Sequence, residues 1–355
     1  MAKWGRAAAL ILLVLAGILA VLSLGQNVLP IAGAGTGLDL AAVMALGCGI
    51  LLLLLDVRRE RLARRATGAI GQATAVMGGR MRTRGVPYQM PLDIEEMNRL
   101  DFQHFMLRAT LQGNYAAPLR DPRSILDIGT GTGRWAREMA VEFPRASVIG
   151  LDINPPPADE AAESRLGADV RPANYAFVAG NVLEGLPFAD QSFDMVHMRA
   201  LVTAIPHARW PFVVGELARV TRAGGWVESL EVTPLEGGGP AIVQVMEWLL
   251  AVTGTRGVEF ADGGRVADRM REAGLAQVAV RRLDLPCGDY GGRVGKMLAA
   301  DWFSVLGALG GMMVARQVTT TERLESAIAG MRAELTSPLL RVVMPTYIAI
   351  GQRAR

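Results

Sequence analysis

Apolar residues are concentrated in two long runs at the start of the chain. Residues 7–24 contain no charged side chain, and residues 40–55 form a second apolar run. As an α-helix, the first run would extend about 27 Å, close to the thickness of a bilayer's hydrocarbon core. The pattern predicts two transmembrane helices over about residues 7–24 and 38–55, which together form a membrane hairpin in residues 1–57.

Basic residues flank this predicted hairpin but are missing from its loop. Lys3 and Arg6 precede the first run, and five arginines follow the second run in residues 58–65. The charge bias predicts that both termini and the rest of the chain lie in the cytoplasm, at an inner or plasma membrane, with the 58–65 cluster on anionic lipid. A cleaved secretory signal would leave the second run unexplained. A single anchor with one peripheral helix remains an alternative.

Residues 58–92 form a basic segment that glycines interrupt repeatedly. We expect a linker with short helical pieces. Residues 94–112 then carry apolar side chains at helical spacing, including Met97 and Leu100, which predicts a helix.

From residue 93 onwards, short apolar groups typical of strands alternate with helical patterns. The predicted strands are residues 124–128, 147–151, 175–178, 193–197, 225–231, 277–283 and 342–350. The predicted helices are residues 134–143, 158–165, 209–221, 240–253 and 264–273. This alternation predicts an α/β fold with a doubly wound sheet over residues 93–355, in which the last two strands form an antiparallel edge. Residues 291–337 are an apolar insertion before the last strand, and we expect a helical cap that completes the core or covers a substrate.

A glycine-rich turn follows the first of these strands. Asp127 is followed by Gly129, Gly131 and Gly133, and a helix pattern begins directly after them. Glycines allow the backbone to approach a nucleotide closely. A dinucleotide site would also require glycine at position 134, where the chain has Arg134. The acid before the turn suits a ligand with an ammonium group, which favours S-adenosylmethionine over NAD.

Two further polar residues follow the next strands. Asp152 ends the second strand, where a carboxylate can accept hydrogen bonds from both ribose hydroxyls. Asn181 follows the third strand, and we expect its side-chain amide at the adenine edge.

These motifs together resemble the class I S-adenosylmethionine-dependent methyltransferases. The resemblance covers residues 95–353 and includes the segments 124–133, 192–197 and 220–227. Segments 99–104, 131–136 and 344–347 are most similar to the methyltransferase-domain proteins typified by fungal regulators of secondary metabolism. The resemblance implies a seven-stranded Rossmann-like sheet and S-adenosylmethionine as cofactor. It also implies that the helical segment 94–112 covers the cofactor pocket. The expected cofactor-binding residues are Asp127, Gly129, Thr130, Gly131, Gly133, Asp152, Ile153, Asn181, Val182 and His197.

This chain departs from the family's pattern at two positions. Asn181 stands where the family commonly has an acid, and Arg134 replaces a residue that is usually apolar.

Methyl transfer needs alignment first and a base only when the acceptor must lose a proton. His197 is the first candidate for that base, because its ordinary pKa lies near neutrality. Glu228 and Glu231 lie near the end of the predicted strand 225–231 and have opposite parity, so at most one would face the site. His104 and Tyr115 are weaker candidates from the preceding helical segment.

The charge distribution excludes some partners. Residues 1–65 hold seven basic and three acidic side chains, so 30 basic and 31 acidic side chains remain for the rest. A nearly neutral catalytic part without a basic cluster predicts no nucleic-acid substrate.

The chain has two cysteines and three histidines, which predicts no disulfide framework and no metal site.

The sequence therefore predicts a membrane-anchored S-adenosylmethionine-dependent methyltransferase that acts on a small, apolar acceptor. A regulatory protein that keeps the fold with little catalysis is the main alternative, and an NAD-dependent oxidoreductase is the second. The sequence leaves open whether the chain forms a homo-oligomer.

Overall fold

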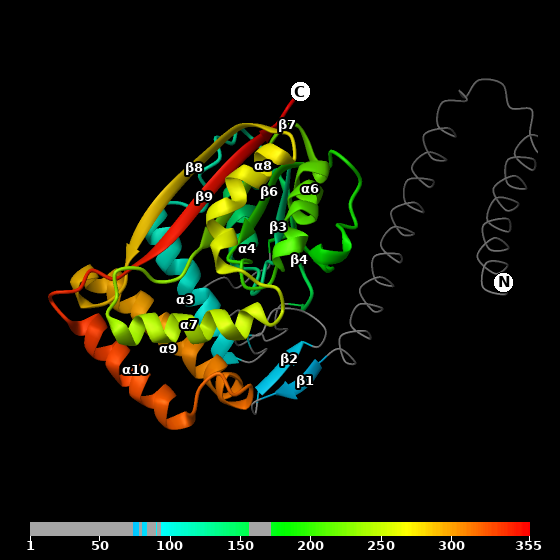
Figure 1. Cartoon of the computed structure of the whole chain (residues 1–355). Coiled ribbons are helices and arrows are strands. Elements are labelled where there is room, and N and C mark those ends of the chain that lie inside the picture. Colours follow the sequence, from blue (N-terminus) through cyan, green and yellow to red (C-terminus); the bar gives the residue numbers. More distant parts are fainter. Residues whose placement is uncertain (1–73, 78–79, 84–89, 91–93, 156–171) are drawn as a thin grey trace, which may run out of the picture. The chain divides into compact units, whose positions relative to one another are not determined.

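The computed structural model describes residues 74–77, 80–83, 90, 94–155 and 172–355 (Figure 1). The predicted membrane hairpin of residues 1–57 and the predicted helix over residues 158–165 lie outside this part. So does most of the predicted linker.

The described parts of the linker form strands rather than helices. β1 (Thr74–Met77) pairs antiparallel with β2 (Arg80–Thr83). The expectation of short helical pieces is wrong here. The Gly78-Gly79 dipeptide between two short segments is a hairpin signal that outweighs helix propensity.

A seven-stranded mixed sheet forms the centre of the described fold, with the order β5-β4-β3-β6-β7-β9-β8. Its strands are β3 (Ser124–Ile128), β4 (Ser147–Asp152), β5 (Tyr175–Ala179), β6 (Phe193–Arg199), β7 (Thr221–Val232), β8 (Leu275–Pro286) and β9 (Val343–Arg353). All seven predicted strands are confirmed. The pairs from β5 to β7 are parallel, whereas β9 is antiparallel to both β7 and β8. The last strand of the chain is thus inserted between β7 and the edge strand β8.

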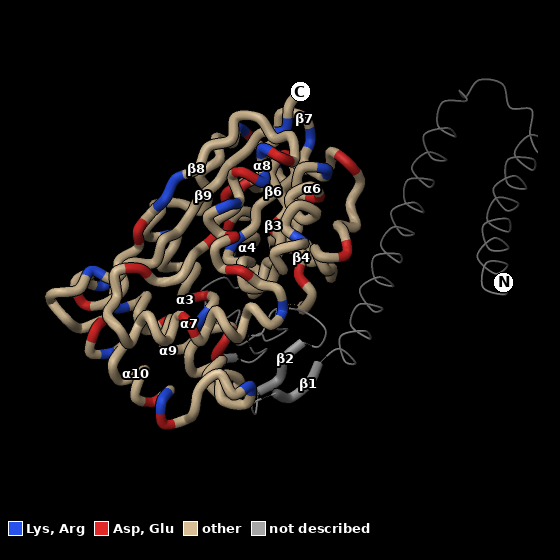
Figure 2. Tube along the Cα trace, in the orientation of Figure 1, with Lys and Arg blue, Asp and Glu red and all other residues tan. Residues whose placement is uncertain are grey.

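Five of the predicted helices are confirmed and surround this sheet (Figure 1). They are α3 (Ile94–Leu111), α4 (Arg134–Glu142), α6 (Trp210–Val220), α7 (Pro240–Gly254) and α8 (Val266–Glu272). α4 illustrates why the pattern worked, because Trp135, Ala136, Met139 and Ala140 lie on one helical face and are all buried. Acidic and basic residues are interspersed along the chain around the sheet (Figure 2).

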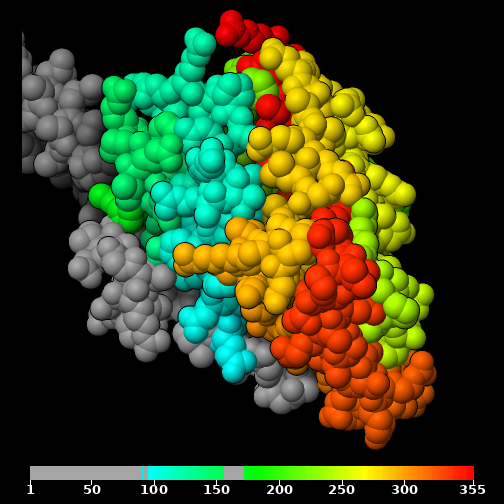
Figure 3. Space-filling view, turned by 90° about the vertical axis from the view of Figure 1, so that its left-hand side faces the viewer, coloured from blue at the N-terminus to red at the C-terminus, as the bar shows by residue number. Residues whose placement is uncertain are grey.

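The predicted cap consists of two helices, α9 (Gly292–Ala315) and α10 (Thr321–Thr336). α9 packs against α3, α7 and α10, and the surfaces of α3 and α9 adjoin on the face shown in Figure 3. Among the described residues, the helical stretch Asp289–Ala315 is the one long and apolar enough to cross a bilayer. Half of the most apolar 18-residue stretch of this helix is buried, and its contacts with α3, α7 and α10 identify it as a core helix of the cap.

The sheet contains a topological switch between β3 and β6. The chain leaves β3 towards β4 and β5 and then returns to place β6 on the other side of β3. Ligands of open α/β sheets bind at such a point, outside the carboxyl ends of the strands.

Candidate functional site

The glycine-rich turn connects β3 to α4 at this switch point. Gly129, Gly131 and Gly133 have φ values of +67°, +54° and +73°, which residues with a β-carbon rarely adopt. The backbone N–H groups of Gly129 and Thr130 donate to the carbonyl oxygen of Leu151 at 2.8 and 3.0 Å. The turn is therefore fixed to the end of β4, and its glycines are required by the backbone path.

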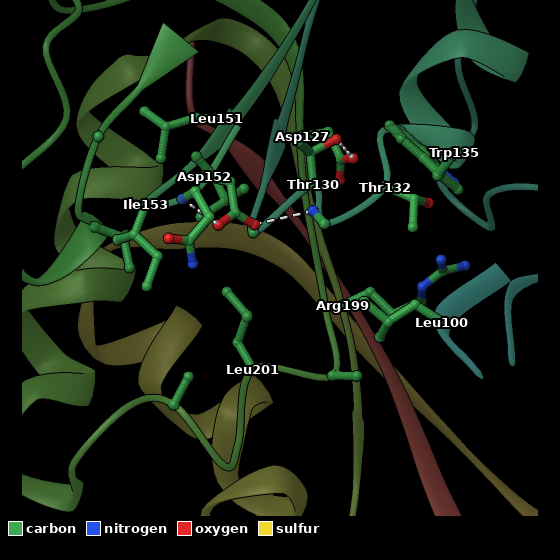
Figure 4. A pocket seen from close by; sticks show the side chains of 18 of the residues that line it. Leu100, Asp127, Thr130, Thr132, Trp135, Leu151, Asp152, Ile153, Arg199 and Leu201 are labelled. Atoms are coloured by element: carbon green, nitrogen blue, oxygen red, sulfur yellow. Dashed lines mark hydrogen bonds between the residues drawn. The ribbon is translucent and has the colours of Figure 1, made fainter. Parts of the chain in front are cut away.

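A cavity lies against this turn (Figure 4), and residues of α3 contribute to its lining. We call it the cofactor cavity. The predicted residues that line it are Asp127, Gly129, Thr130, Gly131, Asp152, Ile153, Asn181 and Val182. Gly133 and His197 are not among its lining residues. A β-carbon at Gly133 would lie 2.6 Å from the hydroxyl of Tyr175, so this glycine serves close packing.

Asp152 is held at the edge of the cofactor cavity by two backbone groups. Its Oδ2 accepts from the N–H of Gly131 at 2.9 Å, and its Oδ1 accepts from the N–H of Asn154 at 3.0 Å (Figure 4). Burial raises the pKa of this carboxyl, although the two N–H donors oppose the shift. A carboxylate has further acceptor capacity beyond these two bonds, which suits a ligand with vicinal hydroxyls.

Asp127 is engaged by two side chains. Its Oδ2 accepts from the hydroxyl of Thr130 at 2.6 Å, and its Oδ1 lies 2.8 Å from Nδ1 of His197. The His197 ring also stacks on Trp135, with 3.8 Å between the ring centroids. His197 is 2% exposed, and its bond to Asp127 holds the carboxylate in place from within the core. His197 is not among the residues that line the cofactor cavity, so the structure does not support the expectation that it binds cofactor or acts as the base.

The two glutamates of β7 are also structural. Oε2 of Glu228 accepts from the N–H groups of Ala116 and Ala117, both at 2.7 Å. The carboxylate of Glu231 accepts from the N–H groups of Leu201 and Val202 at 3.1 and 2.8 Å. Both side chains are buried and hold loops around the site, and neither lines the cofactor cavity. The structure therefore gives no support to their expected catalytic role.

Stability should depend on the protonation of Glu231. Burial raises the pKa of this carboxyl to about 8 in the folded chain, well above its ordinary value. A raised folded pKa stabilises the fold at low pH, and this contribution is lost as the pH rises from about 4.5 through about 8. We expect Glu231→Gln to remove this loss, because the amide resembles the protonated acid. Urea unfolding of the unsubstituted chain and of Glu231→Gln, each at about pH 5 and about pH 9, measures the change in the free energy of unfolding with pH. An equal change in the two proteins would contradict the expectation.

His104 and Tyr115 lie outside the cofactor cavity as well. Nε2 of His104 is 3.1 Å from Oε2 of Glu138, and its Nδ1 is 3.3 Å from Nη1 of Arg199. Burial lowers the pKa of His104. Tyr115 packs against Phe143 with 5.8 Å between the ring centroids. The first residue supports Arg199, and the second belongs to the packing below the turn.

Several lining residues were missed by the sequence analysis as site residues. Glu96, Met97, Leu100 and Gln103 come from α3, the segment that the resemblance placed over the cofactor pocket without naming individual residues. Arg199 lines the cavity from the end of β6, and burial lowers the pKa of its guanidinium. The resemblance was the available signal, but it did not show which side chains of α3 face the cavity.

Asn181 lines the cavity with its side chain already bonded locally. Its Oδ1 accepts from the N–H of Leu183 at 3.0 Å, and its Nδ2 donates to Glu184 at 2.9 Å. The amide caps a short 3₁₀ turn, so both of its polar atoms have partners without an adenine.

A second cavity adjoins the first at Leu100, Gln103 and Ala200. We call it the cap chamber, because α9 contributes part of its wall. Most of its lining is apolar, and the polar exceptions include Arg99, Gln103, Thr203, Thr253 and Asp301. The predicted cap thus encloses space next to the turn as well as completing the core.

One cluster of potential metal ligands occurs among the described residues, and it lies elsewhere. His207, Glu259 and Asp262 bring their ligand atoms within 4.8 Å of one another. Asp262 already bonds Arg269 at 2.6 Å and His207 at 2.9 Å. A cation there would compete with a buried guanidinium, so the cluster is best explained as an ion-pair network.

Comparison with known proteins gives consistent matches. Residues 125–225 match the family described as methyltransferase domain. Methyltransferase str2 of Strobilurus tenacellus is 31% identical over 218 residues, which cover 56% of this chain and 71% of that protein. Methyltransferase str3 of the same fungus is 35% identical, with 40% of this chain and 47% of that protein covered.

More distant matches include a regulator and a solved structure. The secondary metabolism regulator laeA of Aspergillus fumigatus is 28% identical, with 61% of this chain and 58% of the regulator covered. A Haemonchus contortus phosphoethanolamine N-methyltransferase 2, solved with phosphomonomethylethanolamine and S-adenosylhomocysteine, aligns with a TM-score of 0.44 and 16% identity. That alignment covers 73% of this chain and 53% of that structure. The chain therefore spans about half the length of several of these relatives.

Proposed function

Because this chain belongs to the methyltransferase family, we propose that it transfers a methyl group from S-adenosylmethionine to a small, lipophilic acceptor. The observation that carries the proposal is the cofactor cavity, where the turn and Asp152 meet at the switch point beside a second, largely apolar cavity. A transferred methyl group needs donor and acceptor in line, and two adjoining cavities can hold them side by side.

The residues present fit S-adenosylmethionine. The described lining includes the carboxyl groups of Glu96, Asp127 and Asp152, together with the guanidinium groups of Arg134 and Arg199. Asp152 would accept from the ribose hydroxyls, and the other charges suit the cofactor's ammonium, sulfonium and carboxylate groups. Leu100, Ile153 and Leu201 supply apolar surface for the adenine ring (Figure 4). The cofactor supplies an electrophilic methyl group on a positively charged sulfur.

The protein's own residues orient the reactants and exclude water. Residues of α3 line the cofactor cavity, and α9 contributes part of the wall of the cap chamber. Val202, Val305 and Leu309 give the chamber apolar walls, which supports a lipophilic acceptor. Asp127 stays fixed through its bonds to Thr130 and His197.

Transfer of isotopically labelled methyl from S-adenosylmethionine tests the proposal directly. Purified chain is incubated with a lipid extract or with a lipid-free soluble extract, and S-adenosylhomocysteine and labelled product are measured. We expect label in the lipid extract. Label only in the soluble extract would contradict a lipophilic acceptor. Tight cofactor binding without S-adenosylhomocysteine would favour the regulatory alternative, and tight NAD binding without S-adenosylmethionine binding would favour an oxidoreductase.

We further propose that residues 7–24 and 38–55 anchor the chain in a membrane with its catalytic part in the cytoplasm. The apolar length of the two runs and the basic residues beside them support this. Such an anchor would keep the enzyme close to membrane-resident acceptors.

The anchor predicts that the full chain stays in the membrane pellet after alkaline carbonate extraction. Leu15→Arg together with Leu52→Arg should release it, since a charge at a helix centre costs about 2.5–3.5 kcal/mol on insertion. Leu339→Arg is the matched control, because Leu339 is 88% exposed and should not affect the fraction. Recovery of the unsubstituted chain in the supernatant would contradict the anchor.

A further inference from the structure

A buried charged cluster lies between the two cavities. Nε and Nη2 of Arg99 donate to the two carboxylate oxygens of Glu96 at 2.8 and 2.7 Å, and Nη1 donates to Oδ1 of Asp301 at 3.0 Å. Glu96 lines the cofactor cavity, whereas Arg99 and Asp301 line the cap chamber. Glu96 and Asp301 are 2% and 5% exposed. Buried ions carry a desolvation cost that apolar residues would avoid. Charged side chains in the wall of an apolar chamber are therefore candidates for a role in binding or catalysis.

Trp302, the next residue on α9, adds an unpaired donor to the same chamber. Its side chain is 6% exposed and lines the chamber, and its Nε1 has no hydrogen-bond partner among the described residues. A buried N–H without an acceptor is costly and uncommon in folded proteins. The chamber therefore offers a ligand one carboxylate that accepts a hydrogen bond and one indole N–H that donates.

We propose that Asp301 is a catalytic residue that binds the hydroxyl group of an otherwise apolar acceptor and takes its proton during methyl transfer. This inference rests on the proposed function. The hydroxyl proton passes to the Asp301 carboxylate, while an oxygen lone pair forms the bond to the methyl carbon. The carbon–sulfur bond breaks, and its electron pair stays on sulfur to give S-adenosylhomocysteine.

The chemistry of the chamber selects a hydroxyl over an amine. A hydroxyl donates to Asp301 and has two lone pairs, one to accept from Nε1 of Trp302 and one to attack the methyl carbon. A neutral amine has a single lone pair, which cannot do both. Burial raises the pKa of Asp301 while Arg99 lowers it, and Glu96 on the other side of Arg99 weakens that lowering. Arg99 thus positions the carboxylate without removing its capacity to accept a proton.

Binding of 4-hexylphenol tests the polar part of the chamber. It is measured by calorimetry on the full chain saturated with S-adenosylhomocysteine, with hexylbenzene as the matched ligand that lacks the hydroxyl. We expect Asp301→Asn and Trp302→Phe each to weaken binding of 4-hexylphenol by roughly tenfold. Binding of hexylbenzene should change less than about twofold in Asp301→Asn, which removes no apolar contact. Trp302→Phe also removes part of the indole's apolar surface, so it should weaken both ligands, and 4-hexylphenol more than hexylbenzene. Equal effects on both ligands, or no binding of 4-hexylphenol to the unsubstituted chain, would overturn the inference.

Turnover separates proton transfer from positioning. With labelled S-adenosylmethionine and a panel of alkylphenols and alkylamines, Asp301→Asn should lower kcat for the phenols by roughly 100-fold. It should raise KM by no more than the roughly tenfold loss of phenol binding. It should also remove the acidic limb of the kcat pH profile. Asp289→Asn is the control, because Asp289 is an exposed carboxylate beside the start of α9. Unchanged kcat in Asp301→Asn, or transfer to the amines alone, would overturn this inference and leave the proposed function standing. Failure of the unsubstituted chain to bind S-adenosylmethionine would overturn both.

Discussion

Replacing Asp152 with alanine is expected to lower the affinity for S-adenosylmethionine by about 100-fold or more. Each hydrogen bond between a ribose hydroxyl and this carboxylate contributes about 1.5–3 kcal/mol, and the substitution removes two. It also removes the acceptor for the N–H groups of Gly131 and Asn154, so the turn itself loses support. Calorimetric titration with the cofactor measures the effect.

Two further variants separate the cofactor bonds from the support of the turn. Asp152→Asn keeps one acceptor oxygen, so its loss of affinity should be smaller than that of Asp152→Ala. Asp268→Ala removes an exposed carboxylate on α8 and should bind the cofactor like the unsubstituted chain. Cofactor affinity of Asp152→Ala within about threefold of the unsubstituted chain would contradict the assignment of Asp152.

Replacing Trp135 with alanine should lower the free energy of unfolding by about 3–5 kcal/mol. The indole is 2% exposed, stacks on His197, and donates from Nε1 to the carbonyl oxygen of Asn114 at 2.7 Å. Its loss leaves a cavity below the glycine turn and frees the ring that orients Asp127. Urea unfolding followed by circular dichroism measures the change.

The aromatic stack and the hydrogen bond of Trp135 can be distinguished. Trp135→Phe retains a ring against His197 and loses the N–H donor, so we expect about 1–2 kcal/mol of destabilisation. Val141→Ala on the same helix is the control, because Val141 is 71% exposed and its truncation should cost little. A loss below about 1 kcal/mol for Trp135→Ala would show that the surrounding core collapses into the vacated space.

The strands and the turn could be predicted because their signals are local. β3 shows this, since Ile125, Leu126 and Ile128 are apolar and buried and the glycines follow at once. The same reasoning placed Asp127 and Asp152 at strand ends, where parallel strands of one sheet bring their carboxyl ends together. Both residues line the cofactor cavity.

The candidate bases could not be judged from position in a strand. His197 and Glu228 occupy neighbouring positions of β6 and β7, yet one bonds Asp127 and the other bonds Ala116 and Ala117. These partners lie far away in sequence, so the residues next to His197 and Glu228 do not predict them. A buried polar side chain takes whichever partner the fold brings to it, because leaving it unpaired is costly.

By itself, the sequence determined the order of strands and helices, the glycine turn and the two acids that follow β3 and β4. Periodicity and backbone conformation act over a few residues, so neighbouring residues specify them. Only the tertiary structure decided that His197, Glu228 and Glu231 support the fold, and that Arg99 meets Asp301. Arg99 and Asp301 are 202 positions apart, and their contact exists only once the cap has packed against α3.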